Sequence, residues 1–196
     1  MAYRFRDLRL ETWEDMVYVP AEDSELLAEA VAGAVGRVLD VGTGSGIQAL
    51  VAAKTADSVL GVDVNPHAVE LAGLNARANG IGNAQFRVSD LFSEVDGMFD
   101  LIVFNAPYLP VEDEGMLAKA WSGGEKGRDV IDRFLDGVAA HLVDGGRLLM
   151  LASSVNEPEE MIVRLNASGL DAEVRARRRI FFEELLVISA VYKPSR

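Results

Sequence analysis

Five apolar runs along the chain have the length of buried β-strands, and more polar segments separate them. These runs are residues 37–42, 58–64, 84–90, 99–105 and 146–153. Short runs of successive apolar residues are typical of parallel strands that are covered on both faces. Between the runs, apolar side chains recur at helical spacing in residues 46–56, 66–80 and 129–142. The alternation predicts a doubly wound α/β fold, with a mostly parallel sheet between two layers of helices.

Two further helices are predicted outside this alternation. Before the first run, residues 20–36 have apolar positions at helical spacing, with Pro20 at the start. Asp23 or Ser24 is expected to cap this helix, since both side chains can accept from free backbone N–H groups. After the fifth run, residues 157–169 predict the other helix.

Two strand-like stretches follow, at residues 172–182 and 184–193, and predict a terminal strand pair. The first contains the basic run 175–179, which we interpret as a solvated strand edge because charge usually faces water. The length of 196 residues favours a single domain over 1–196. Within it, residues 1–35 are expected to form an N-terminal extension and the capping helix.

Polar side chains stand at the carboxyl ends of four of the predicted strands. They are Asp40, Asp63, Asp90 and Asn105. Ligands of open α/β sheets bind beyond the carboxyl ends of the strands, near the point where the strand order reverses. The sequence therefore predicts a ligand site at this edge of the sheet.

Three glycines, Gly42, Gly44 and Gly46, occupy alternate positions between the first strand and the next helix. Glycine there permits tight turns and lets a ligand approach the backbone. A dinucleotide fingerprint would need glycine where Ile47 stands, so that pattern fails. The spacing D-x-G-x-G-x-G instead resembles motif I of class I S-adenosylmethionine-dependent methyltransferases. That resemblance implies a Rossmann-like, seven-stranded sheet with an antiparallel C-terminal strand, and S-adenosylmethionine as cofactor.

The acids at the strand ends fit this cofactor. Asp63 is suited to accept bonds from both ribose hydroxyls, as acids do in dinucleotide folds. Asp90 would face the adenine amino group, with Leu91 packed on the ring. Asp40 can attract the cationic end of the cofactor, directly or through water. Taken singly, each Asp could equally be a helix cap or a turn residue.

Residues 105–108, Asn-Ala-Pro-Tyr, resemble motif IV of methyltransferases that act on planar amino or amide nitrogens. Asn105 and the carbonyl of Ala106 would accept the two N–H bonds of that nitrogen and hold it in line with the methyl group. Tyr108 can pack on the planar group, and Pro107 biases Ala106 toward an extended backbone. The family places proline at position 106, so alanine puts the rate in doubt more than the reaction type.

Two more segments, 17–27 and 120–135, resemble HemK-type protein glutamine methyltransferases, best the short archaeal and eukaryotic branch. The resemblance extends from Val17 to about Tyr192. It implies methylation of the glutamine side-chain nitrogen in a Gly-Gly-Gln motif of a class I peptide chain release factor. It also places Ser24 near the methionine end of the cofactor, and it makes Asn105 a cofactor contact as well as the contact of the substrate amide.

Bacterial members of the family carry an N-terminal helical domain, whereas about 40 residues precede the glycine loop here, too few for a separate domain. We expect residues 109–129 to form a substrate-binding flap, because this connection is long and follows the catalytic motif. Gly123, Gly124 and Gly127 would be its hinges and Trp121 its anchor. The short branch implies a small zinc-binding activator subunit, which we expect to add a strand beside residues 84–88 at the sheet edge.

Composition narrows the class of protein further. The chain has no cysteine, and its two histidines, His67 and His141, are far apart, so no metal site is expected. The net charge of −12 disfavours a general nucleic-acid coater. No apolar run reaches the roughly 20 residues that a membrane helix needs, and the N-terminus is unlike a signal peptide. We expect a cytoplasmic protein without a membrane partner.

Three other functions remain open from the sequence. A nucleic-acid adenine-N6 or cytosine-N4 methyltransferase would use the same motif IV, but usually needs a basic face or a recognition domain. A small-molecule methyltransferase would have no use for motif IV. A non-catalytic cofactor-binding scaffold is suggested only by Ala106.

Overall fold

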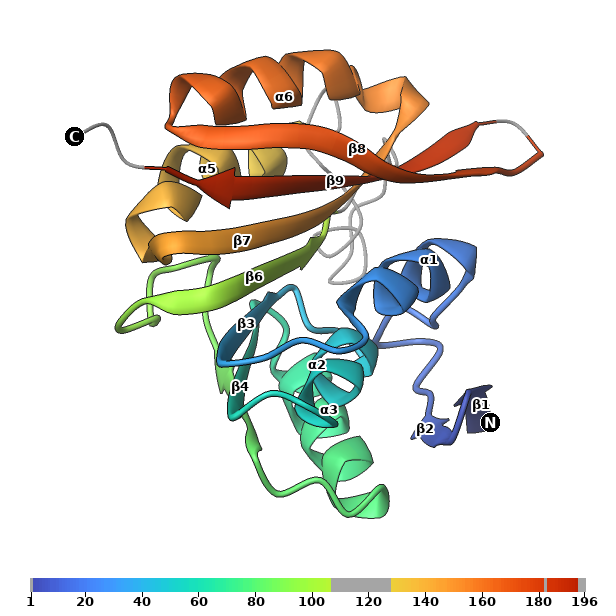
Figure 1. The fold of residues 1–196 in the computed structure, drawn as a ribbon. Helices are drawn as coiled ribbons and strands as arrows, with labels where there is room; N and C mark the ends of the chain where they lie inside the picture. The colour runs from blue at the N-terminus through green and yellow to red at the C-terminus, as the bar shows by residue number, and fades with distance from the viewer. Residues whose placement is uncertain (1, 107–127, 182, 194–196) are drawn as a thin grey trace.

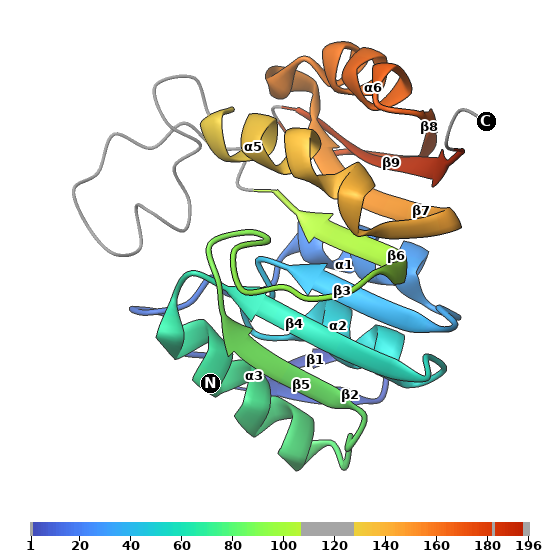
Figure 2. The same cartoon turned by 90° about the vertical axis from the view of Figure 1, so that its left-hand side faces the viewer.

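The computed structural model describes residues 2–106, 128–181 and 183–193. Figure 1 shows a central twisted sheet with helices packed on both sides, and Figure 2 shows the same strands from the side. The strands are β1 (Ala2–Phe5), β2 (Leu8–Glu11), β3 (Arg37–Val41), β4 (Ser58–Asp63), β5 (Ala84–Val88), β6 (Phe99–Asn105), β7 (Leu142–Ser153), β8 (Leu170–Arg179) and β9 (Glu184–Tyr192). The helices are α1 (Glu22–Val31), α2 (Ile47–Ala53), α3 (Pro66–Ala78), α5 (Asp129–Gly137) and α6 (Pro158–Ala167), with 3-10 turns η1 (Val138–His141) and η2 (Ser154–Asn156).

The large sheet has seven strands in the order β5-β4-β3-β6-β7-β9-β8. Strands β5, β4, β3, β6 and β7 pair in parallel, and β9 runs antiparallel to both of its neighbours, β7 and β8. The doubly wound sheet with an antiparallel C-terminal strand is therefore confirmed. The order reverses between β3 and β6, so a crevice is expected beyond the carboxyl ends of these two strands.

The two faces of the sheet bury separate sets of side chains. In β6, Leu101 and Val103 join the cluster that contains α1 and α2, whereas Ile102 and Phe104 join the cluster that contains α5 and α6. Successive side chains of a strand point to opposite faces, so an uninterrupted apolar run fills both cores at once. Burial on both faces therefore explains why the strands are apolar at successive positions in the sequence.

An N-terminal hairpin, β1–β2, was not predicted from the sequence. It pairs Ala2 with Glu11 and Phe5 with Leu8, and its side chains Leu8 and Leu10 are fully buried in the cluster with α1 and α2. Asn75 of α3 bonds both the N–H and the C=O of Glu11, at 2.7 and 3.2 Å. The residues expected to be an extension are thus part of the core.

Several predicted boundaries need correction. Helix α1 begins at Glu22 with Ala21 as N-cap and has no side-chain cap, so Asp23 and Ser24 lie inside the helix and do not cap it. The helix expected over 129–142 ends at Gly137 and continues only as the 3-10 turn η1. Strand β7 starts at Leu142, four residues before the predicted run, because Leu142 still pairs with Phe99 of β6.

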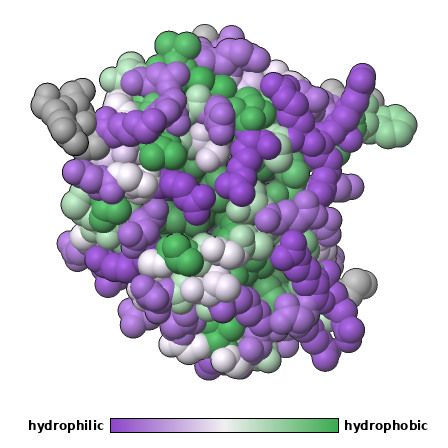
Figure 3. All heavy atoms as spheres, viewed as in Figure 1, coloured by the Kyte–Doolittle hydropathy of each residue, from purple (hydrophilic) through white to green (hydrophobic). Residues whose placement is uncertain are grey.

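The basic run 175–179 lies on β8, the outer strand of the sheet, and the prediction of a solvated edge is confirmed. Arg175, Arg177 and Arg179 are exposed, whereas Arg178 pairs with Glu29 of α1 at 3.1 Å. Figure 3 shows many hydrophilic side chains on one face of the molecule, interspersed with hydrophobic ones. Among the described helices, none is long and apolar enough to cross a membrane.

Candidate active site

A cavity of about 320 Å³ opens at the carboxyl edge of the sheet, where the strand order reverses. Its walls come from the ends of β3, β4 and β6, the start of α1 and the first turns after the glycine loop. The volume falls in the range of small-ligand sites, which are commonly formed at such switch points. The fold therefore creates a cavity at the edge that the polar strand ends predicted.

The glycine loop bends through three left-handed residues. Gly42, Gly44 and Gly46 have φ of 65°, 54° and 87°, a region that side chains with a Cβ rarely adopt. At Gly44 a Cβ would meet nothing within 4 Å, whereas at Gly46 it would approach Ala72 at 3.1 Å. Gly44 therefore borders open space inside the cavity, and Gly46 permits close packing of α2 on α3.

Asp40 lies behind this loop and is 1 % exposed. Its Oδ2 atom accepts bonds from the Thr43 hydroxyl at 2.7 Å and from the Ala49 N–H at 3.1 Å. Burial raises the pKa of Asp40 to about 7, although these two hydrogen bonds lower it. Asp40 thus ties the strand end to the loop and to the first turn of α2.

Asp63 stands at the end of β4 and lines the cavity. One carboxylate oxygen accepts from the Gly44 N–H and the other from the Asn65 N–H, both at 2.9 Å. Burial raises the pKa of Asp63, while its bonds from backbone N–H groups lower it. Each oxygen keeps a further lone pair, so this carboxylate can accept bonds from two hydroxyl groups of a ligand.

Asp90 and Leu91 line the same cavity just beyond β5. Asp90 is half exposed and pairs with Arg133 of α5 at 2.8 Å, a partner that the sequence did not predict. Leu91 has a φ of 50°, an unusual backbone for a branched side chain. The cavity is therefore closed on this side by a charged pair and an apolar side chain.

Asn105, at the end of β6, joins the cavity to the start of α1. Its Nδ2 atom lies 3.3 Å from both Oδ2 of Asp23 and the Ser24 hydroxyl. Its Oδ1 atom is buried and has no hydrogen-bond partner among the described residues. A buried acceptor without a partner costs folding free energy, so a donor from a bound group would be favourable at this atom.

Comparison with known proteins identifies the family to which the chain belongs. Residues 21–179 match the methyltransferase small domain family. A putative protein N5-glutamine methyltransferase of Methanocaldococcus jannaschii is 43% identical over 180 residues, which cover 89% of this chain and 91% of the relative. The human methyltransferase HEMK2 is 32% identical over 189 residues, 88% of each chain.

A solved structure agrees. The E. cuniculi Mtq2–Trm112 complex, responsible for methylation of the translation termination factor eRF1, contains a chain with a TM-score of 0.74 and 27% identity, which covers 90% of this chain and 99% of that one. The protein belongs to the HemK-type glutamine methyltransferases. As a class I methyltransferase of this family, it is an enzyme that takes its methyl group from S-adenosylmethionine.

The cavity of this methyltransferase fits that cofactor. Asp63 offers two carboxylate oxygens for ribose, Gly44 leaves room at the backbone, and Leu91 presents an apolar surface beside Asp90. Among the described residues, no cluster of His, Asp or Glu could hold a metal ion.

The structure brings most of the predicted site residues together. Eight of them line the cavity: Ser24, Gly42, Gly44, Asp63, Asp90, Leu91, Asn105 and Ala106. Two predicted cofactor contacts, Asp40 and Gly46, are not among its lining residues, because one is turned into the loop and the other faces α3. Pro107, Tyr108 and the flap residues Trp121, Gly123, Gly124 and Gly127 lie outside the described residues.

Two residues of the cavity wall were missed as site residues. The sequence predicts a helix cap at Asp23 and no role for Tyr18, yet both line the cavity and the Tyr18 hydroxyl donates to Asp23 at 3.0 Å. The signal was present in the segment 17–27, which carries both of them next to Ser24. Asp23 also contacts Asn105, which is 82 positions away in the chain, and a local sequence pattern does not contain such a contact.

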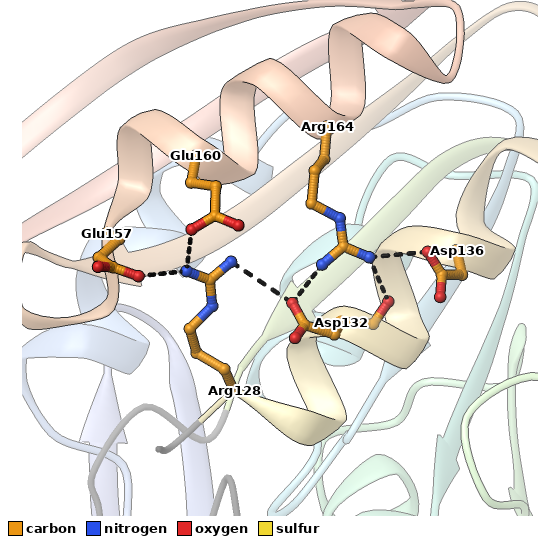
Figure 4. Close-up of polar contacts among 6 residues, drawn as sticks. All are labelled: Arg128, Asp132, Asp136, Glu157, Glu160 and Arg164. Atoms are coloured by element: carbon orange, nitrogen blue, oxygen red, sulfur yellow. Dashed lines mark hydrogen bonds and ion pairs between the residues drawn. The ribbon is translucent and has the colours of Figure 1, made fainter.

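The predicted flap ends at Arg128 and Asp129, where the described structure resumes with a buried arginine. Arg128 pairs with Glu157 at 2.5 Å and Glu160 at 2.6 Å, at the start of α6 (Figure 4). Figure 4 also shows Arg164 of α6 bonded to Asp132 of α5, which in turn faces Arg128. This network joins α5 and α6 and fixes the position at which the chain enters α5.

Proposed function

We propose that this enzyme methylates the side-chain amide nitrogen of the glutamine in a Gly-Gly-Gln motif of a class I peptide chain release factor. The observation that carries the proposal is the buried Oδ1 atom of Asn105, an acceptor at the cavity wall without a partner among the described residues. A primary amide brings two N–H donors, and one of them can satisfy this atom.

The neighbouring backbone offers an acceptor for the second N–H of the substrate amide. Ala106 lines the cavity and is 2 % exposed. Because it follows Asn105 directly in the chain, its carbonyl can act together with the Asn105 amide. Two acceptors of this kind orient the nitrogen and stabilise the positive charge that grows on it. When bound in this cavity, S-adenosylmethionine would supply an electrophilic methyl group, and Asn105 with the Ala106 carbonyl would hold the nitrogen that receives it.

The relatives support the same substrate. The Methanocaldococcus jannaschii protein is named a putative protein N5-glutamine methyltransferase, and the E. cuniculi complex is responsible for the methylation of eRF1. This chain covers 91% and 99% of the lengths of those two proteins, which supports a shared type of substrate. We expect the enzyme to work in the cytoplasm, where termination factors act.

A small partner subunit, of the zinc-binding activator type, forms the second part of the proposal. The E. cuniculi enzyme is found in complex with Trm112. Here β5 is an outer strand of the sheet, and Val88 at its end is 46 % exposed. An outer strand offers unpaired backbone groups, so we propose that the partner adds a strand beside residues 84–88.

The function is tested by transfer of labelled methyl groups from S-adenosylmethionine to purified release factor, with and without its Gly-Gly-Gln glutamine. We expect label on the wild-type factor and none after Gln→Ala, with mass spectrometry placing the methyl group on that glutamine. Label that persists after Gln→Ala would give the enzyme a different substrate residue.

The partner is tested by co-expression, gel filtration and hydrogen exchange. We expect a stable complex in which amides 84–88 gain protection, and Val88→Asp should weaken it. Val163→Asp, at a 65 % exposed position on α6, is the matched control and should not. A complex without protection at 84–88 would move the interface elsewhere, and full activity of the isolated chain would remove the need for a partner.

A further inference from the structure

We propose that Asp23 is a positioning residue for methyl transfer, which fixes the orientation of the Asn105 side-chain amide. The inference rests on the proposed function in one respect, that the reacting group is an N–H donor. Its physical basis is the hydrogen-bond network at the start of α1, in which a buried carboxylate contacts the amide.

Asp23 is held from several sides. It is 3 % exposed, and its Oδ1 atom accepts from the Ser24 N–H at 2.6 Å, the Ser24 hydroxyl at 3.1 Å and the Tyr18 hydroxyl at 3.0 Å. These three donors engage one oxygen only. The other oxygen, Oδ2, is left to face Asn105 Nδ2 at 3.3 Å.

The polarity of this contact decides which end of the Asn105 amide faces Asp23 and which end keeps a free acceptor. An ionised carboxylate only accepts hydrogen bonds, so it selects the NH₂ end of the amide. A flipped amide would set its oxygen against Asp23 Oδ2, two acceptors at 3.3 Å, and would lose the bond. Asp23 therefore turns the NH₂ group inward and leaves Oδ1 free to accept from a substrate.

This orientation matters for the reaction. With its NH₂ group held by Asp23, Asn105 has Oδ1 left to accept from the N–H of a substrate amide, whereas a flipped amide would confront that N–H with another donor. The negative charge of Asp23 behind the amide also strengthens Oδ1 as an acceptor, since linked hydrogen bonds polarise one another. Asp23 thus supports the positive charge that grows on the nitrogen without touching it.

The structure also separates this role from simple helix stabilisation. Asp23 lies in the first turn of α1, where any acid is favourable to the helix dipole. Glu22 in the same turn is exposed and its side chain does not bond Asn105, so it offers the dipole effect alone. Glu22→Gln is therefore a matched control for Asp23→Asn.

A double-mutant cycle tests the proposal, with kcat measured at saturating S-adenosylmethionine and release factor. We expect Asp23→Asn to lower kcat by about tenfold to a hundredfold, in the range for loss of a preorganised polar contact. In an Asn105→Ala background the same change should alter kcat by less than about twofold, because the group through which Asp23 acts is gone. Glu22→Gln should leave kcat unchanged in both backgrounds.

Tyr18→Phe is a milder second variant if Asp23→Asn unfolds. It removes one donor to Asp23 Oδ1, and we expect a several-fold fall in kcat that also vanishes in the Asn105→Ala background. If the effects of either variant multiply with that of Asn105→Ala, the role is merely structural and the proposal is overturned.

A spectroscopic readout separates this inference from the proposed function. The side-chain NH₂ signals of Asn105, assigned with Asn105→Ala, should exchange slowly with solvent in the wild type and faster in Asp23→Asn. That result holds without any substrate, so it survives even if the wild-type enzyme fails to label release factor. Equal exchange in the two proteins would overturn the positioning role.

Discussion

The Gly44 N–H donates to Asp63 Oδ2 at 2.9 Å, so the glycine loop and the acid of the next strand form one unit. The bond holds the loop at the rim of the cavity, and the Asn65 N–H holds the other carboxylate oxygen. A carboxylate that is fixed at both oxygens would meet the ribose hydroxyls without first losing side-chain freedom, which would favour binding.

We predict that Asp63→Ala weakens S-adenosylmethionine binding by about 1.5–3 kcal/mol, through loss of charge-assisted bonds and of the support for Gly44. Titration calorimetry on the two proteins measures this. Asp57→Ala is the matched control, because Asp57 is exposed just before the opposite end of β4. Unchanged affinity in Asp63→Ala would remove the residue from the cofactor site.

Asn105→Ala should leave the fold intact and cut turnover by roughly 10²-fold or more, because it removes the acceptor that we propose for the reacting nitrogen. Cofactor affinity should change much less than turnover. Single-turnover methylation with both substrates saturating provides the measurement. Near-normal turnover would end the catalytic role of the residue.

Ala106→Pro should keep activity level or raise it, because the family places proline there and Pro107 already favours an extended chain before it. Ala106 is 2 % exposed and packs in the cluster that contains α5 and α6. Ala106→Leu, which overfills the same position, is the contrast and should lower the melting temperature. A collapse of activity in a folded Ala106→Pro variant would show that this enzyme differs from its relatives at motif IV.

Much of this fold could be predicted because the strands of the sheet are buried on both faces. The runs around Leu39, Val62 and Ile102 are apolar at successive positions, and the chain places a polar residue where each strand leaves the core. The β1–β2 hairpin escaped prediction because its alternation, with Leu8 and Leu10 buried, spans only four residues in β2.

The residue types of the site could be predicted from the sequence. Which of these side chains face the cavity could be predicted less well, because long-range contacts determine their orientation. Asp63 lines the cavity as expected, yet the chemically identical Asp40 is turned behind the loop by Thr43 and Ala49. Likewise Asp23 looked like a helix cap in the sequence, and only its contact with Asn105 gives it another role. Which carboxylate faces a ligand depends on side-chain packing over long sequence separations, which a local pattern does not contain.

The network around Arg128 leads to a stability prediction. Arg128→Met should lower the free energy of unfolding by about 1–2 kcal/mol, since it removes charge-assisted bonds to Glu157 and Glu160, whose side chains stay more than half exposed to water. Lys54→Ala breaks an ion pair with Asp7 that is exposed on both sides, and should cost less. Urea unfolding of both variants compares them, and equal losses would mean that burial of Arg128 adds nothing.

Asp40 leads to a prediction on pH. Its pKa is about 7 in the folded state, raised from 3.8 chiefly by burial and to a lesser degree by the nearby Asp63. The folded protein therefore holds this proton more tightly than the unfolded chain does. The resulting stabilisation is complete below about pH 4 and is lost as the pH rises through about 7, where a charged carboxylate must be buried.

Asp40→Asn removes this titration and keeps an oxygen that can accept from Thr43 and Ala49. The difference in unfolding free energy between Asp40→Asn and the wild type should therefore shift in favour of the variant, by up to a few kcal/mol, as the pH rises from about 4 to about 7. Urea unfolding at several pH values measures it, with Asp57→Asn as the exposed control. A difference that stays constant across this window would mean that Asp40 remains charged in the folded protein, and that its bonds from Thr43 and Ala49 outweigh its burial.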